Sequence, residues 1–286
     1  MTCRCSLSAP GTSITRIGVY VYGIASLAAG IMDLVWGEFE SAHQPIQALG
    51  DQIPGVELLA YIAAVWLLVG GAGILSRRTA RAGAAALAVI YCIFAAFSFP
   101  RFYTAPRILG YRATVYIGVL GGLGQQLILV VAAVVVYASL DARDSLSRRT
   151  ARVARWTFGL CAIDFGLAHL TGVRAVAPLV PHWMPMGGDF WTVLTGIAFA
   201  VAGIAVVSGL LDVLASRLLA LMLLIFSGLA LVPLIFAYPR DHVAWGSNAY
   251  NLAAVGAAWI VADWLASRQQ LVEDPEGAKQ TNRSLA

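Results

Sequence analysis

Residues 115–138 read VYIGVLGGLGQQLILVVAAVVVYA, a run in which no side chain carries a charge. A helix rises about 1.5 Å per residue, so this run is long enough to cross the ~30 Å hydrocarbon layer of a membrane. Similar apolar runs recur along the whole chain. We predict eight membrane-spanning helices, at 15–36, 56–76, 83–100, 115–138, 154–173, 190–210, 213–236 and 249–267.

The composition supports the same fold class. Hydrophobic residues make up 59% of the 286 residues and charged residues only 12%, against roughly 45–50% and about 25% in soluble domains. The net charge of +4 comes from basic residues scattered through short connections, without the continuous basic face of a nucleic-acid-binding protein. We therefore predict an all-α polytopic membrane protein whose partner is the lipid bilayer and which binds no nucleic acid.

The basic residues are distributed unevenly between the two sides of the predicted membrane. Fourteen of the 19 fall on the side of the two termini, and five fall on the other side. Cytoplasmic connections are enriched in Lys and Arg, so this bias predicts a cell (inner or plasma) membrane protein with both termini in the cytoplasm. The five basic residues on the outer side are Arg101, Arg107, Arg112, Arg174 and Arg240.

The two halves of the chain match each other at nearly constant offsets. Gly23 and Gly30 correspond to Gly159 and Gly166 at an offset of 136, and Asp33 corresponds to His169 at the same offset. Gly71 matches Gly203, the sequence 99–101 (Phe-Pro-Arg) matches 238–240 (Tyr-Pro-Arg), and 138–139 matches 266–267.

This pattern predicts a tandem duplication, in which each copy has four spans. Because four is an even number, the two copies run parallel and form two four-helix bundles. We divide the chain into a tail (1–14), a first repeat (15–140), an Arg-rich cytoplasmic linker (141–153), a second repeat (154–267) and a disordered tail (268–286).

Charged residues inside or beside a span are costly and usually face a bundle interior or a wet cavity. In the first repeat we expect Asp33, Glu57 and Arg101 to meet at the outer end, and in the second repeat Asp189 and Arg240 to meet in the same way beside His169. Arginine pairs well with carboxylates, so these sets are either clamps that hold loops to the bundles or vestibules for a ligand or proton. Near the cytoplasmic end we expect a structural ion pair between Asp263 and Arg268.

The second repeat carries the stronger candidates for a ligand or proton site, which are Asp164, His169, His182 and Trp183. Asp164 lies in the middle of a span, and histidine titrates near neutral pH. Asp164 and His169 are about 140° apart around the helix, so they do not form a direct relay. Thr195, Ser227 and Asn251 are possible partners for Asp164.

The sequence offers no evident cofactor or metal site. Cys3 and Cys5 lie in the polar N-terminal tail, whereas Cys92 and Cys161 are single residues within apolar runs. No Cys or His residues occur at zinc spacing. The small residues Gly118, Gly121, Gly122 and Gly124 predict close helix packing.

The second half resembles the DoxX-like membrane proteins in three segments, Phe165–His169, Val180–Pro185 and Phe190–Ala198. The resemblance covers about 155–267, and it reaches 16–139 only through the internal repeat. It implies a DoxX-like four-helix bundle that has been duplicated.

The family takes its name from a membrane subunit linked to thiosulfate:quinone oxidoreduction, and other relatives are associated with redox complexes or with assembly and trafficking. The resemblance thus implies a membrane subunit or scaffold, not catalytic by itself, of a redox system with a soluble or membrane redox partner. A quinone needs only an apolar slot with one or two polar groups. The alternative is a transporter of protons or of a lipophilic small molecule through the second bundle. Catalytic residues, substrate and oligomeric state stay open.

Overall fold

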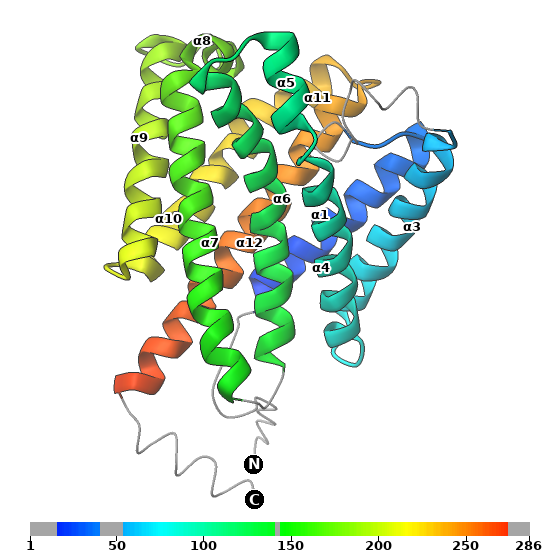
Figure 1. The fold of residues 1–286 in the computed structure, drawn as a ribbon, viewed down its shortest axis with the longest axis vertical. Helices are drawn as coiled ribbons and strands as arrows, with labels where there is room; N and C mark the ends of the chain where they lie inside the picture. The colour runs from blue at the N-terminus through cyan, green and yellow to red at the C-terminus, as the bar shows by residue number, and fades with distance from the viewer. Residues whose placement is uncertain (1–15, 41–53, 141–143, 274–286) are drawn as a thin grey trace, which may run out of the picture.

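The computed structural model describes residues 16–40, 54–140 and 144–273, and the regular elements in these ranges are all helices (Figure 1). The first half contains α1 (Arg16–Trp36), α3 (Val56–Leu75), α4 (Ala80–Phe97), α5 (Arg101–Leu109) and α6 (Ala113–Ser139). The second half contains α7 (Asp144–Thr171), α8 (Val173–Val176), η1 (Ala177–Leu179), α9 (Gly187–Ser208), α10 (Asp212–Phe226), the π-helix η2 (Ser227–Leu231), α11 (Val232–Ala237) and α12 (His242–Glu273).

The helices have the length and composition of membrane spans. In the described residues, seven helical segments are long and apolar enough to cross a membrane, and α7 gives an eighth when it is counted with the segment beyond its 88° bend. Large apolar side chains such as Val69, Val201 and Leu218 are exposed on the surface, where lipid rather than water is the natural neighbour. The prediction of a polytopic helical membrane protein is confirmed at this level.

Most span boundaries lie close to their predicted positions, and two differ instructively. α7 begins at Asp144, so most of the predicted linker at 141–153 is helical. α12 runs from His242 to Glu273 and includes part of the predicted disordered tail. Arginine and glutamine are good helix formers, so both helices extend beyond their apolar part. The predicted tail 1–14 and residues 274–286 lie outside the described residues.

The helices of each half pack in the same order. α1 packs against α3, α3 against α4 and α4 against α6, while α7, α9, α10 and α12 repeat this sequence of contacts. The last helix of each half then packs against the first helix of the other half, α6 against α7 and α12 against α1. α6 and α12 also contact each other. The two halves therefore share one core along a seam formed by α1, α6, α7 and α12.

Glycines bring the first two helices of each half into backbone contact. A Cβ atom on Gly71 would lie 2.9 Å from the carbonyl oxygen of Gly23. In the second half, a Cβ atom on Gly203 would lie 2.6 Å from the carbonyl oxygen of Gly159. These are the glycines that match in the two halves of the sequence, and their contacts hold α1 to α3 and α7 to α9 in the same way.

The span that begins with α10 is interrupted at the π-helix η2. The side-chain nitrogen of Asn251 in α12 donates to the carbonyl oxygen of Leu223 at 2.6 Å and to Ser227 Oγ at 2.8 Å. A side chain that inserts beside the helix ladder is a known cause of such an interruption, and here the Leu223 carbonyl oxygen accepts both Asn251 and the backbone N–H of Ser227. Asn251 and Ser227 are thus hydrogen-bonded to each other rather than to Asp164.

Candidate functional site

A buried acid near the end of α1 and a histidine at the start of α12, from opposite halves of the chain, lie in contact. Asp33, near the end of α1, has 0% of its surface exposed. Its Oδ1 atom accepts the backbone N–H of Glu40 at 3.1 Å and lies 3.5 Å from Nε2 of His242, the first residue of α12. Its Oδ2 atom is buried and has no hydrogen-bond partner in the described chain. The ion pair therefore joins α1 to α12 across the seam.

The histidine contacts two carboxylates. Its Nδ1 atom lies 3.2 Å from Oε1 of Glu38, so both ring nitrogens face an acid. An imidazolium donates from both nitrogens, whereas a neutral imidazole has a single N–H. The Trp36 indole stacks on the imidazole, and its Nε1 donates to the carbonyl oxygen of Arg240 at 3.4 Å.

A third acid, Glu40, completes this group. Glu40 is 2% exposed, and its side chain packs against Gly246 of α12, where any Cβ atom would collide with it. Its charge acts on the Arg101 guanidinium. We refer to Asp33, Glu38, Glu40 and His242 as the seam cluster. Two carboxyl groups, those of Asp33 and Glu38, thus face one imidazole, and the buried Glu40 side chain lies against α12 nearby.

Hydroxyl groups continue from the seam cluster into the bundle. Tyr91 lies within electrostatic range of Asp33 and Glu40, and its hydroxyl is 3.1 Å from Ser26 Oγ. Ser26 in turn donates to the carbonyl oxygen of Tyr22 at 3.0 Å. The Tyr22 hydroxyl donates to the carbonyl oxygen of Leu129 in α6 at 2.9 Å. Buried polar groups therefore reach from the cluster towards the middle of the first half.

Asp164 approaches the seam from the second half. Its Oδ2 atom is buried without a hydrogen-bond partner in the described chain, and a Cβ atom on Gly121 of α6 would lie 3.7 Å from it. The predicted partner Thr195 instead donates to the carbonyl oxygen of Trp191 at 2.8 Å. The glycine on α6 leaves room for this carboxyl group.

The other three residues of the predicted second-repeat site lie elsewhere. His169 uses Nδ1 to contact the carbonyl oxygen of Phe165 at 2.8 Å, and its ring centroid is 5.2 Å from that of Phe199. His182 and Trp183 are exposed on the loop between η1 and α9, with 69% of Trp183 accessible. No contact joins the four predicted residues into one site in the described part of the chain.

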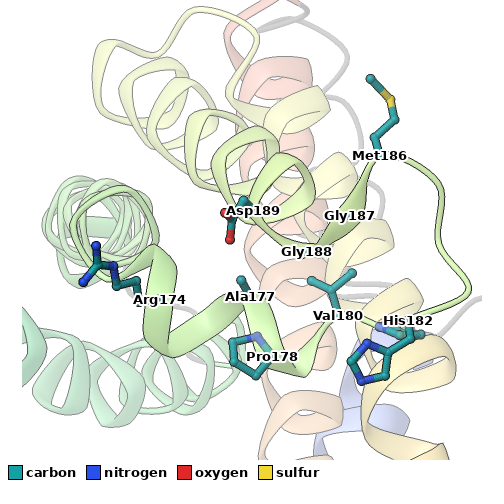
Figure 2. A pocket seen from close by; sticks show the side chains of 10 residues that line it. Arg174, Ala177, Pro178, Val180, His182, Met186, Gly187, Gly188 and Asp189 are labelled. Carbon is teal, nitrogen blue, oxygen red and sulfur yellow. The ribbon is translucent and has the colours of Figure 1, made fainter.

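The loop of His182 borders a pocket with a volume of about 540 Å³ (Figure 2). Asp189, in the first turn of α9, lines the same pocket, while the Arg174 side chain extends away from that acid. No ion-pair contact joins Asp189 to Arg240 among the described residues, and this pair stays a prediction.

The acids of the remaining predicted pairs have the following neighbours. Glu57 accepts a hydrogen bond from Tyr61 at 3.3 Å, and Glu40 lies within electrostatic range of Arg101. Asp263 is buried, with its Oδ1 atom 3.7 Å from Nη2 of the half-exposed Arg217 on α10. The pair of Asp263 with Arg268, which lies further along α12, stays a prediction. The contact between Asp263 and Arg217 links α12 to α10 and helps to hold these two helices together.

Sequence reasoning identified Asp33 but missed His242, Glu38 and Glu40. The available signal was the occurrence of three acids within the short stretch 33–40 after a span. His242 was assigned to a loop because the apolar part of its helix begins later.

The described residues contain no group of three His, Cys, Asp or Glu side chains that could hold a metal ion. Comparison with family models, with curated proteins and with solved structures found no match. The function is therefore argued from the geometry of the seam cluster.

Proposed function

We propose that this chain is a proton-linked transporter of the cell membrane whose proton site is the seam cluster. One observation carries the proposal. Asp33 is fully buried and faces His242 across the seam, while one of its carboxylate oxygens has no hydrogen-bond partner in the described chain. A buried negative charge with an unpaired oxygen is costly, so a proton from the histidine or from water has a site to occupy.

An ion pair that only holds two helices together needs fewer ionisable groups than the seam cluster contains. One acid and one base with satisfied lone pairs hold two helices together, whereas in the seam cluster two acids, Asp33 and Glu38, face one histidine and a further acid, Glu40, is buried nearby. The hydroxyls of Tyr91, Ser26 and Tyr22 extend the polar groups inward. Ionisable groups within membranes mark ion and proton pathways, and the half-buried Asp164, whose Oδ2 atom is enclosed, adds a further carboxyl group at the seam.

The proposed architecture is a tandem duplication of a DoxX-like four-span unit. The repeated order of helix contacts and the equivalent glycine contacts support it. So does a matched pair of hydrogen bonds, in which Ser139 Oγ and Ser267 Oγ donate to the carbonyl oxygen three residues earlier at 2.7 and 2.8 Å. The bias of 14 basic residues to five supports cytoplasmic termini. In this orientation the seam cluster lies at the extracytoplasmic end.

A second candidate is a membrane subunit or scaffold of a redox, possibly quinone-linked, system. The observation that favours it is the exposed loop with Trp183 and the pocket lined by Arg174, His182 and Asp189. Exposed aromatic side chains beside a pocket are typical of docking surfaces. This candidate predicts no proton flux from the purified chain alone.

The test is proton flux in proteoliposomes. The protein is reconstituted into vesicles that contain a pH-sensitive dye, and a potassium gradient with valinomycin sets the membrane potential. Wild type is expected to carry protons at several times the rate of protein-free vesicles. Asp33→Asn should reduce the flux to that of protein-free vesicles, because the amide still accepts the Glu40 N–H but cannot exchange a proton.

The matched control is Asp241→Asn. Asp241 is exposed next to the cluster, and its Oδ1 atom accepts the backbone N–H of Val243 at 3.0 Å, a bond that asparagine retains. This variant should transport at the wild-type rate. Wild-type flux equal to that of empty vesicles would exclude the transport function and favour the second candidate.

A further inference from the structure

The carboxyl group of Asp164 lies between lipid and a neighbouring helix. Asp164 follows Leu160 by four residues and precedes Leu167 by three, and residues at these spacings share one face of a helix. Both leucines are exposed, and the exposed apolar face of a membrane-spanning helix contacts lipid. Asp164 itself is half-buried. Its carboxyl group therefore lies at the edge of the lipid-facing surface of α7.

The other side of Asp164 faces α6, which lies beside α7 (Figure 1). A Cβ atom on Gly121 would lie 3.7 Å from Asp164 Oδ2, and a Cβ atom on Gly124 would lie 3.6 Å from Cys161 Sγ. The absence of side chains at these two glycines lets the carboxyl and thiol groups approach the α6 backbone. The Oδ2 atom is enclosed there without a hydrogen-bond partner in the described chain.

Within the described ranges, no cation neutralises the Asp164 carboxyl group, which takes part in no ion pair. Arg101 lies over Gly122, and successive residues of a helix point about 100° apart, so the guanidinium approaches α6 from another direction. α6 contributes no charged side chain, and the single one of α9 is Asp189 in its outer first turn. The titratable neighbour on α7 is Cys161, one turn away.

These surroundings favour the protonated form of Asp164. An isolated carboxylate in a low-dielectric medium is costly, whereas the neutral acid costs much less. In the absence of a cation, the acid is therefore expected to hold a proton at rest. The matching position of the first half, at the offset of 136, is Ala28. A proton site of this kind is thus a property of the second half.

A tyrosine of α12 lies near both the hydroxyl groups of the first half and the thiol next to Asp164. Tyr250 is within electrostatic range of Tyr91 and of Cys161, and Cys161 is within range of Asp164. Tyr250 follows His242 by eight residues, about 12 Å along the helix axis, while Asp164 precedes the end of α7 by seven residues, about 10 Å. The two side chains thus lie at a similar depth below the outer end of the bundle.

We propose that Asp164 is a second proton-binding site, protonated at rest and accessible from lipid, which receives the proton of the seam cluster by way of Tyr250. The proposal deepens the proposed transport function and rests on it. Once Asp164 has released its proton towards the cytoplasm, the Tyr250 hydroxyl gives its proton to the carboxylate and accepts another from the side of the seam cluster. The tyrosine is unchanged, Asp164 gains one proton and the cluster loses one.

The first test is labelling with dicyclohexylcarbodiimide, an apolar reagent that enters lipid and reacts with protonated carboxyl groups. The acid O–H adds across a C=N bond of the reagent, oxygen to carbon and hydrogen to nitrogen, and an acyl shift gives a stable N-acylurea without a leaving group. The full chain in nanodiscs is labelled and mapped by peptide mass spectrometry, which distinguishes Asp164 from Cys161. We expect the label on Asp164.

Two other acids serve as controls for this labelling. Asp33 is fully buried and Asp241 is exposed beyond the end of the span, so neither should take up the apolar reagent. A water-soluble carbodiimide with an amine should give the reverse pattern, with label on Asp241 and none on Asp164. This second reaction also shows that the protein in the nanodiscs is open to modification.

The second test combines labelling with proton flux in proteoliposomes. Asp164→Asn keeps the shape of the side chain but removes the acid, so it should lose the label and reduce flux to that of protein-free vesicles. Tyr250→Phe should keep the label and lower flux several-fold, because the hydroxyl is missing. Asp241→Asn should keep both. Should Asp164→Asn fail to fold, partial labelling of the wild type replaces it, and flux should fall in proportion to the labelled fraction.

An unlabelled Asp164, or equal labelling of Asp33 and Asp241, would overturn the protonated site at the lipid face. Wild-type flux in Asp164→Asn, or in fully labelled wild type, would remove Asp164 from the proton route, and wild-type flux in Tyr250→Phe would overturn the step through Tyr250. These outcomes are separable from a failure of the transport function. A labelled Asp164 in a wild-type protein without flux would reject transport and leave the proton-binding site standing.

Discussion

The Trp36 indole lies face to face with the His242 imidazole, with ring centroids 4.9 Å apart and planes 5° from parallel. The contact joins the end of α1 to the start of α12, and the Trp36 hydrogen bond to the carbonyl oxygen of Arg240 reinforces it. The indole covers the histidine of the seam cluster and fixes its ring orientation.

We expect Trp36→Leu to destabilise the protein by about 2 kcal/mol, because it removes a stacked ring pair and a hydrogen bond, each worth roughly 0.5–1.5 kcal/mol. Trp36→Phe keeps an aromatic ring and should lose about half as much. Thermal unfolding in detergent measures both variants. Equal loss in the two would mean that stacking does not contribute.

Gly203→Ala should destabilise the second half. The new Cβ atom would lie 2.6 Å from the carbonyl oxygen of Gly159, so α9 must move away from α7 at a cost of about 1–3 kcal/mol. Gly228→Ala is the matched control, because its Cβ atom would meet nothing within 4 Å. The melting temperatures of the two variants should differ clearly, and equal values would contradict the backbone contact.

Asn251→Leu should destabilise η2 and expose its amides. The leucine removes two hydrogen bonds, one to the carbonyl oxygen of Leu223 and one to Ser227 Oγ, and each is worth about 0.5–1.5 kcal/mol. Hydrogen–deuterium exchange of the segment 223–231 should become faster. Asn248→Leu on the same helix provides the comparison, because its buried Oδ1 atom already lacks a hydrogen-bond partner, and this change should leave exchange in 223–231 unaltered.

Labelling of single cysteines tests the proposed orientation. Asp241 and Arg149 are both exposed and lie beyond opposite ends of the predicted spans. In a background without native cysteines, Asp241→Cys should react with a membrane-impermeant maleimide in intact cells, and Arg149→Cys only after lysis. The reverse pattern would invert the topology and place the seam cluster on the cytoplasmic side.

The sequence was sufficient for the membrane class and for most span boundaries, because long apolar runs leave few alternatives in lipid. It was insufficient where helices continue into polar sequence. Windows that count apolar residues stop at about 154 and 249, whereas α7 and α12 start at Asp144 and His242.

The candidate site was predictable only in part. Asp33 was identified because a charge in a span is costly, but its partner was sought within the same repeat. The partner His242 comes from the other repeat, because α12 packs directly against α1. Periodicity and offsets describe each repeat separately and carry no information on how two repeats contact each other.

The packing of α12 against α1 also has a consequence for biosynthesis. α1 is the first described helix to leave the ribosome and α12 is the last, so the face of α1 that carries Asp33 has no partner helix until translation of the second half is complete. During that interval a carboxyl group is held at the translocon or in lipid without its histidine. Insertion of the final helix is therefore the step that both closes the first half and assembles the buried ion pair.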